Sequence, residues 1–143
     1  MSATQIVRRV RLISILLAYG LIACSDDEGP SNTQIELEGS WTGEFGDEEI
    51  SSASWNGATL VEFDNAENTA ITRNAEDAAF DPGKFNKLVW TEPRNDSFYY
   101  CTVDYGLDSA DAAAATAKTA DEADLEGVGC GGFPWSHLTR VAP

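Results

Sequence analysis

The chain has 143 residues, with 24 Asp and Glu against nine Lys and Arg, and a formal net charge of −15. So acidic a surface repels phosphate backbones, which excludes a nucleic-acid partner held by phosphate contacts. The length suits one domain, and the 43% hydrophobic and 23% charged fractions are typical of a globular chain rather than a disordered one.

Residues 1–23 have the pattern of an export signal. Three arginines and no acid precede an apolar run of about a dozen residues, which is shorter than the roughly 20 needed for a transmembrane helix. The run ends in Leu21-Ile22-Ala23-Cys24, which resembles the lipobox of bacterial lipoproteins. The alternatives are an ordinary signal peptide with a chance cysteine, or a buried N-terminal helix.

The lipobox resemblance implies a processing route and a location. The signal would be cleaved before Cys24, and that residue would receive acyl chains such as palmitate on its thiol and its amino group. Two or three chains anchor a protein stably where one does not. Because Ser25 rather than Asp follows Cys24, the resemblance favours the outer membrane, on its periplasmic or surface face.

Residues 24–34 follow as a lipidated cysteine and a flexible acidic tether, since residues 25–34 contain no apolar side chain. Cleavage removes three arginines and no acid, so the net charge of −15 becomes −18 in the mature chain. Such a chain is repelled by an anionic leaflet. We therefore expect the lipid, and not charge, to hold the domain at the membrane.

The remaining residues, 35–143, are expected to form a single mainly β domain. Residues 35–45 alternate strictly between apolar or glycine and polar positions, the period of a half-buried antiparallel strand. Turn signals such as Asn56-Gly57 separate further runs of this kind. We predict a small antiparallel β-barrel or sandwich of about seven strands, at residues 35–45, 50–55, 59–63, 69–73, 85–91, 98–105 and 133–141.

One segment departs from the strand pattern. Residues 108–123 are rich in alanine and open with Asp108 or Ser109 as N-cap and Asp111 in the first turn. They predict one helix before the last strand, and because alanine buries little area this helix needs a docking surface. The alternative is a low-complexity acidic loop.

Two cysteines remain once Cys24 is assigned to lipidation. An exported chain meets an oxidising compartment, so we expect Cys101 and Cys130 to form a disulfide. The bond would close a loop of about 30 residues and stabilise the fold by roughly 3.5 kcal/mol in the chain-entropy description. The alternative is two buried free thiols.

No catalytic motif stands out, and we expect a protein that is not an enzyme. Gly127, Gly129 and Gly132 match G-x-G-x-x-G by letter, but the dinucleotide motif needs a strand before it and a helix after it. His137 is the only histidine, and it has neither a zinc-site nor a nucleophile motif around it. A structural role is the favoured interpretation for all four residues.

Acidic loops are the remaining candidates for chemistry, as a glycosidase pair or as calcium sites. Neither loop matches the EF-hand spacing, and a chain with 24 acids produces local clusters by chance. We therefore expect no metal and no other cofactor, with Ca²⁺ as the weak alternative. The residues concerned are Asp64, Asn65, Glu67 and Asn68 in one loop and Asp121, Glu122, Asp124 and Glu126 in the other.

Aromatic residues are dense for a small domain, and large rings fall on both faces of the strands. Rings on an outer face suggest a surface that stacks on a small ligand or grips a protein partner. The alternative is that most of them pack in the core. The candidate ligand or partner surface comprises Trp41, Trp90, Tyr100, Trp135 and Arg140.

Two weaker resemblances concern the mature domain. Gly39-Ser40-Trp41 is similar to the G-x-W opening of lipocalins, in which the Trp closes the barrel floor against an Arg on a late strand. That resemblance implies Arg140 as the partner and a carrier of a small apolar ligand, although the helix of lipocalins follows the last strand. The stretch from residue 89 to 106, with GCGGFPW downstream, resembles uncharacterised lipoproteins of the myxobacterial kind, which implies no activity.

Taken together, these patterns predict a lipid-anchored cell-envelope protein that works as a non-enzymatic binding or structural module. The membrane would be its partner through the N-terminal acyl chains. A protein or small-ligand partner would contact the β domain. A lipocalin-like carrier of a small apolar ligand is the alternative.

Overall fold

A computed structural model describes residues 33–142 of the chain. The predicted signal peptide at residues 1–23, the lipidation of Cys24 and most of the tether lie outside the described residues. Thr33 and Gln34, at the end of the predicted tether, are exposed.

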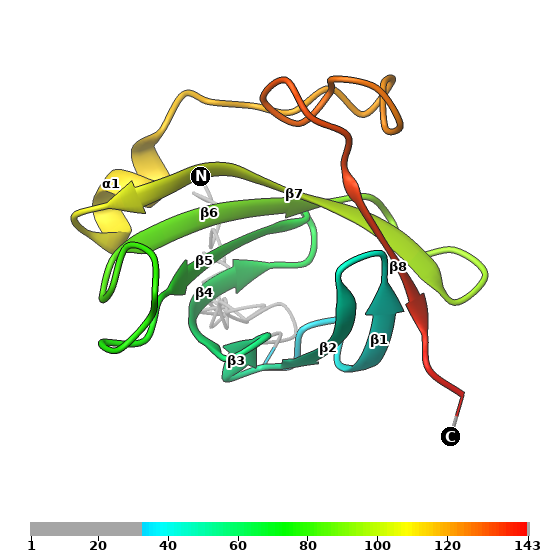
Figure 1. The fold of residues 1–143 in the computed structure, drawn as a ribbon, viewed down its shortest axis with the longest axis horizontal. Coiled ribbons are helices and arrows are strands. Elements are labelled where there is room, and N and C mark those ends of the chain that lie inside the picture. Colours follow the sequence, from blue (N-terminus) through cyan, green and yellow to red (C-terminus); the bar gives the residue numbers. More distant parts are fainter. Residues whose placement is uncertain (1–32, 143) are drawn as a thin grey trace, which may run out of the picture.

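The described residues form a closed antiparallel barrel in which each strand pairs with the next and the last pairs with the first (Figure 1). The predicted mainly β class is thereby confirmed, and the architecture is the barrel rather than the sandwich. A short helix precedes the last strand, as predicted. The elements are β1 (Gly39–Gly43), β2 (Gly46–Ser51), β3 (Ser54–Trp55), β4 (Ala58–Asp64), β5 (Thr69–Arg73), β6 (Phe85–Trp90), β7 (Ser97–Leu107), α1 (Ala110–Ala115) and β8 (Ser136–Arg140).

The first predicted strand, residues 35–45, is wrong in its extent. Residues 36 and 37 form a turn, β1 begins only at Gly39, and the chain reverses at residues 44 and 45 into β2. Gly46 follows this reversal with a φ of 116°, which a side chain would disfavour. The alternation extends to Phe45 within the turn, so periodicity alone did not reveal the hairpin. The predicted strand at residues 50–55 is wrong as well, because residues 52 and 53 form a turn that separates β2 from β3, and the barrel has eight strands.

The predicted helix at residues 108–123 is also shorter than expected. Ser109 is its N-cap, and the Ser109 hydroxyl accepts a hydrogen bond from the amide of Ala112 at 3.1 Å. The helix ends because Thr116 leaves it with a ψ of 135° and donates its hydroxyl to Asp104 of β7 at 2.6 Å. Tertiary hydrogen bonding therefore outweighs alanine propensity. Within residues 33–142, no helix has the length and hydropathy needed to cross a membrane.

Two separate apolar cores stabilise this fold. The larger fills the barrel interior and includes three fully buried rings, Trp41, Trp90 and Phe98. The smaller lies on the outer side of β7, where Trp135 and Leu125 pack around the disulfide of Cys101 and Cys130. Figure 1 shows the segment from α1 to β8 running along β7, and this segment covers the smaller core.

The two ends of the barrel differ. At one end, the floor, the turn at residues 35–38 inserts Ile35 and Leu37 into the core, and the indole of Trp41 donates to the Leu37 carbonyl at 2.7 Å. The other end, the mouth, is surrounded by the β1–β2 and β3–β4 turns, the loop from β5 to β6, the end of β7 and the start of β8. The floor is closed by apolar side chains, and the mouth is where a site can form.

Candidate functional site

The barrel interior changes from apolar to polar toward the mouth. A cavity of about 310 Å³ opens there, which has room for roughly ten water molecules. Its inner wall carries two aromatic rings and several hydrogen-bonding side chains, in contrast with the Trp and Phe rings of the floor. The inward-facing residues of this wall are Glu48, Trp55, Thr72, Asn86, Leu88, Tyr100 and Thr102.

Glu48 is the buried charged group of this cavity and is only 7% exposed, whereas Asp81 at its border is exposed. It shares the inward face of β2 with Ile50, two residues further along the strand. The indole of Trp55 donates to one carboxylate oxygen at 3.2 Å, and the Tyr100 hydroxyl donates to the other at 2.8 Å. Both donors are neutral, so they stabilise the carboxylate without compensating its charge.

Tyr100 is held as a hydrogen-bond donor by its surroundings. Burial raises its pKa well above the ordinary value, and the neighbouring charge of Glu48 raises the pKa further. Ionising the phenol would place a second negative charge beside the first. Tyr100 therefore remains protonated and keeps the Glu48 carboxylate in a fixed position.

Amide side chains line another part of the same wall. The Asn86 amide donates to the side-chain oxygen of Asn74 at 2.8 Å, and its own oxygen accepts from the backbone of Gly106 at 3.3 Å. Thr72 is a further partner of Asn86, at 3.4 Å. These bonds orient polar groups around the mouth on β5, β6 and β7, which is how small-molecule sites gain specificity.

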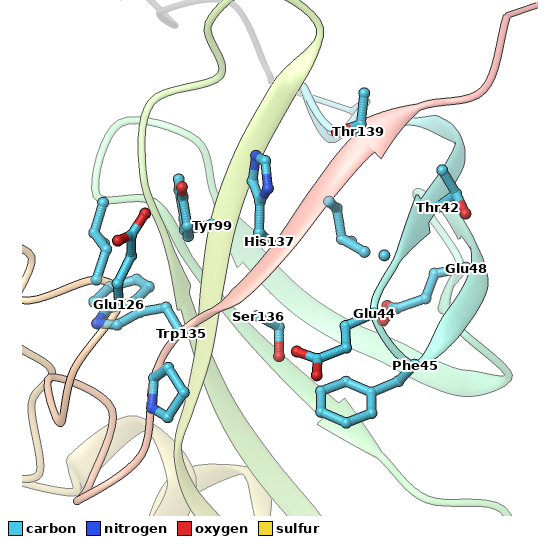
Figure 2. A pocket seen from close by; sticks show the side chains of 14 residues that line it. Thr42, Glu44, Phe45, Glu48, Tyr99, Glu126, Trp135, Ser136, His137 and Thr139 are labelled. Atoms are coloured by element: carbon cyan, nitrogen blue, oxygen red, sulfur yellow. The ribbon is translucent and has the colours of Figure 1, made fainter.

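A second cavity reaches Glu48 through the side of the barrel. Strands β1 and β8 pair at three positions only, the last of them Gly43 opposite Leu138. Beyond this pair the β1–β2 turn and the start of β8 enclose a cavity of about 460 Å³. Figure 2 shows Glu44, Phe45 and Glu48 on one side of it and Ser136 on the other. Glu48 lines both cavities and so lies where they approach each other.

Exposed aromatic rings surround this end of the molecule. Phe45 is 85% exposed at the tip of the β1–β2 turn. It lines a third cavity, of about 790 Å³, together with Tyr105 of β7 and Phe133 before β8. Phe80, in the loop from β5 to β6, borders the mouth cavity and is also exposed. Aromatic rings at the entrance of a polar cavity are typical of small-molecule sites.

The residues predicted as a ligand or partner surface do not form one surface, although Tyr100 and Trp135 both line the third cavity. Trp41 and Trp90 fill the barrel core and Trp135 belongs to the outer core, so these three rings pack inside. Arg140 lies at the floor, over the ring of Trp41. Only Tyr100 lines the mouth cavity.

The other residues considered in the sequence lie outside the mouth cavity, although Glu126 and His137 border the side cavity. His137 stacks on Tyr99 on the outer wall, with ring centroids 4.4 Å apart. Gly129 pairs its backbone closely with the 121–124 turn, accepting from the Asp121 amide at 2.8 Å. Asp64 accepts from backbone amides of its own turn. Among residues 33–142, no group of three or more His, Cys, Asp or Glu side chains has the arrangement of a metal site.

Glu48 was not predicted from the sequence, and Trp55 was not singled out as a site residue. The predicted strand began at Ile50, so Glu48 was left in a presumed polar connection. A signal was present, because Glu48 and Ile50 are two residues apart and therefore share one face of a strand. A glutamate on the apolar face of a strand identifies a buried carboxylate.

Comparisons with protein-family models, with curated proteins and with solved structures found no match to this chain.

Proposed function

We propose that this protein is a small-ligand-binding module of the cell envelope, anchored through acyl chains on Cys24 and binding its ligand in the mouth of the barrel. The observation that carries the binding role is the polar cavity of about 310 Å³ inside the mouth, built around the buried Glu48 carboxylate. Pockets with a few oriented polar groups and aromatic walls are suited to small molecules.

The proposed role is binding rather than catalysis. Tyr100 has a raised pKa and therefore serves as a donor and not as a base. His137 borders the side cavity, but its ring stacks on Tyr99 on the outer wall, whereas Glu48 and Tyr100 face the interior. The ligand is small, because Trp41, Trp90 and Phe98 fill the floor and leave only the mouth half of the barrel hollow.

A lipocalin-like carrier of an apolar ligand is the second candidate. The contact between Arg140 and Trp41 supports it, since the resemblance to lipocalins implies that pair at the floor. The polar lining of the mouth favours the first candidate, because burying Glu48, Asn86 and Thr72 under a purely apolar ligand leaves hydrogen-bonding groups without water.

Filling the cavity tests the binding role. Ala58 faces the mouth at the start of β4, and Thr59 beside it is exposed. We expect Ala58→Trp to abolish binding of small amphipathic compounds by full-length protein, measured by native mass spectrometry. Thr59→Trp adds the same ring to the outer face and should leave binding intact. Equal binding by both variants, or no bound compound with the wild type, would contradict the proposal.

The anchor has a separate test. Cells given radioactive palmitate should label the wild-type protein and not Cys24→Ala, and only the wild type should sediment with membranes. Ser25→Ala is the control, since it changes the neighbouring residue without removing the thiol. Equal labelling of the wild type and Cys24→Ala would contradict the proposed acyl anchor on Cys24.

A further inference from the structure

We infer that the ligand of the mouth is a small organic cation carrying a protonated amine, which Glu48 binds as its counter-ion. The inference rests on the proposed function and specifies the chemistry of that site. Its basis is a buried carboxylate that faces a cavity and is held only by neutral donors.

The charge of Glu48 is not matched within the described residues. The four ion pairs found there join Arg73 to Glu76, Lys84 to Asp108, Lys118 to Asp104 and Arg140 to Asp96. None of them includes Glu48. Removing a carboxylate from water carries a large desolvation cost, which a cation inside the cavity would offset.

The bases near the mouth are engaged by other carboxylates. Lys118, which lines the third cavity, donates to Asp104 at 2.6 Å. Lys84 and Arg73, at the ends of the loop from β5 to β6, pair with Asp108 and Glu76. The mouth and side cavities are bordered by further acids, Glu44 and Asp81. The potential around Glu48 is therefore negative, and it attracts cations and repels anions.

The chemistry of the wall favours an organic cation over a metal ion. Trp55 and Tyr100 lie beside Glu48 with ring centroids 5.3 Å apart and an interplanar angle of 60°. Aromatic faces attract organic cations, and the carboxylate oxygens accept hydrogen bonds from an ammonium group. A hard metal ion needs several oxygen ligands. No His, Cys, Asp and Glu group of that kind occurs among residues 33–142.

The test compares three probes that share one ring and differ in charge: benzylammonium, benzyl alcohol and benzoate. Each is titrated into full-length wild-type protein in detergent by isothermal titration calorimetry. We expect benzylammonium to bind most tightly and benzoate least. Glu48→Gln should weaken benzylammonium by about tenfold or more, as loss of a charge-assisted contact does, and should leave benzyl alcohol unchanged.

A matched control is available on the same strand. Glu49 is the next residue of β2 and is exposed, so Glu49→Gln removes the same charge from the outer face. This variant should bind benzylammonium with a dissociation constant within about twofold of the wild-type value. Equal weakening by the two variants would mean that the overall charge attracts the probe, and would overturn the inference. If Glu48→Gln does not fold, the Ala58→Trp and Thr59→Trp variants decide, because both keep the net charge. Thr59→Trp should prefer benzylammonium as the wild type does, whereas Ala58→Trp should lose that preference, and an equal preference in both variants would overturn the inference.

The outcomes separate the inference from the proposed function. If benzyl alcohol or benzoate binds the wild type as well as benzylammonium does, and Ala58→Trp blocks them, the mouth binds small molecules and the cation inference is wrong. If the mouth binds none of the three probes and no other small compound, the proposed function itself fails.

Discussion

Arg140 lies over the ring of Trp41, with its guanidinium carbon 4.2 Å from the ring centroid, and the two residues face each other in the pairing of β8 with β1. Arg140 also donates to the Glu38 carbonyl at 3.1 Å. The last strand is thus joined to the first at the floor, where the turn at residues 35–38 closes the barrel. The floor is filled by apolar side chains, and the polar cavity lies at the mouth end.

Removing the Arg140 side chain should loosen this junction. We expect Arg140→Ala to lower the free energy of unfolding by about 1 to 2 kcal/mol, from loss of the cation–π contact, one hydrogen bond and the exposed ion pair with Asp96, which contributes least. Urea denaturation followed by tryptophan fluorescence would measure it. Arg94→Ala is the control, because it removes an exposed arginine from the turn between β6 and β7. Equal stability of the two variants would show that the contact contributes nothing.

The disulfide between Cys101 and Cys130 should stabilise the outer core. Its cysteines are separated by 29 residues along the chain and their Cα atoms are 5.6 Å apart. Closing a loop of that length contributes about 3.5 kcal/mol in the chain-entropy description. The Cys101→Ala, Cys130→Ala double variant should therefore unfold at markedly lower urea, and dithiothreitol should lower the midpoint of the wild type but not that of the variant. A wild-type urea midpoint that dithiothreitol does not change would contradict a stabilising role of the disulfide.

Stability should depend on pH through Asp104. The Lys118 ammonium, and next the Thr116 hydroxyl, donate hydrogen bonds that hold the pKa of Asp104 below its usual value. A lowered folded-state pKa means that the ionised carboxylate stabilises the fold above the unfolded pKa. This contribution is lost as pH falls through the folded pKa.

The corresponding experiment compares unfolding curves at pH 7 and at pH 3. Asp104→Asn should be less stable than the wild type at pH 7, and the difference should shrink as the pH falls. Asp77→Asn, in the exposed loop between β5 and β6, should match the wild type at both values. A difference for Asp104→Asn that stays constant with pH would exclude an electrostatic origin.

The strands could be predicted because the side chains that face the barrel interior are apolar along much of the length of the strands. β4 to β8 lie close to the expected runs, and the pairing of Trp41 with Arg140 agrees with the expected contact. The β1–β2 hairpin was missed because Phe45, within the turn, extends the period-two pattern of β1, although the inward positions change from odd numbers in β1 to even numbers in β2. The helix was predicted too long because Thr116 finds a partner in Asp104, which lies 12 residues earlier in the chain.

The site itself was harder to predict than the fold. Tyr100 was among the candidate residues, but Glu48 and Trp55 become its neighbours only when the barrel closes. Tyr100 and Glu48 are 52 residues apart in sequence, and no local pattern reports such a contact. The aromatic residues proposed as a surface are mostly core, since large rings are also what a small barrel needs to fill its floor.

The four indole groups offer the most direct measurement of the central claim that the ligand binds at the mouth beside Glu48. The indole of Trp55 donates to Glu48, whereas those of Trp41, Trp90 and Trp135 donate to Leu37, Glu36 and Asp121. In ¹H–¹⁵N spectra of the full-length protein, benzylammonium should shift the Trp55 indole signal with dose and leave the Trp41 signal in place. An unmoved Trp55 signal at saturating probe, or a shift confined to Trp135, would contradict the claim.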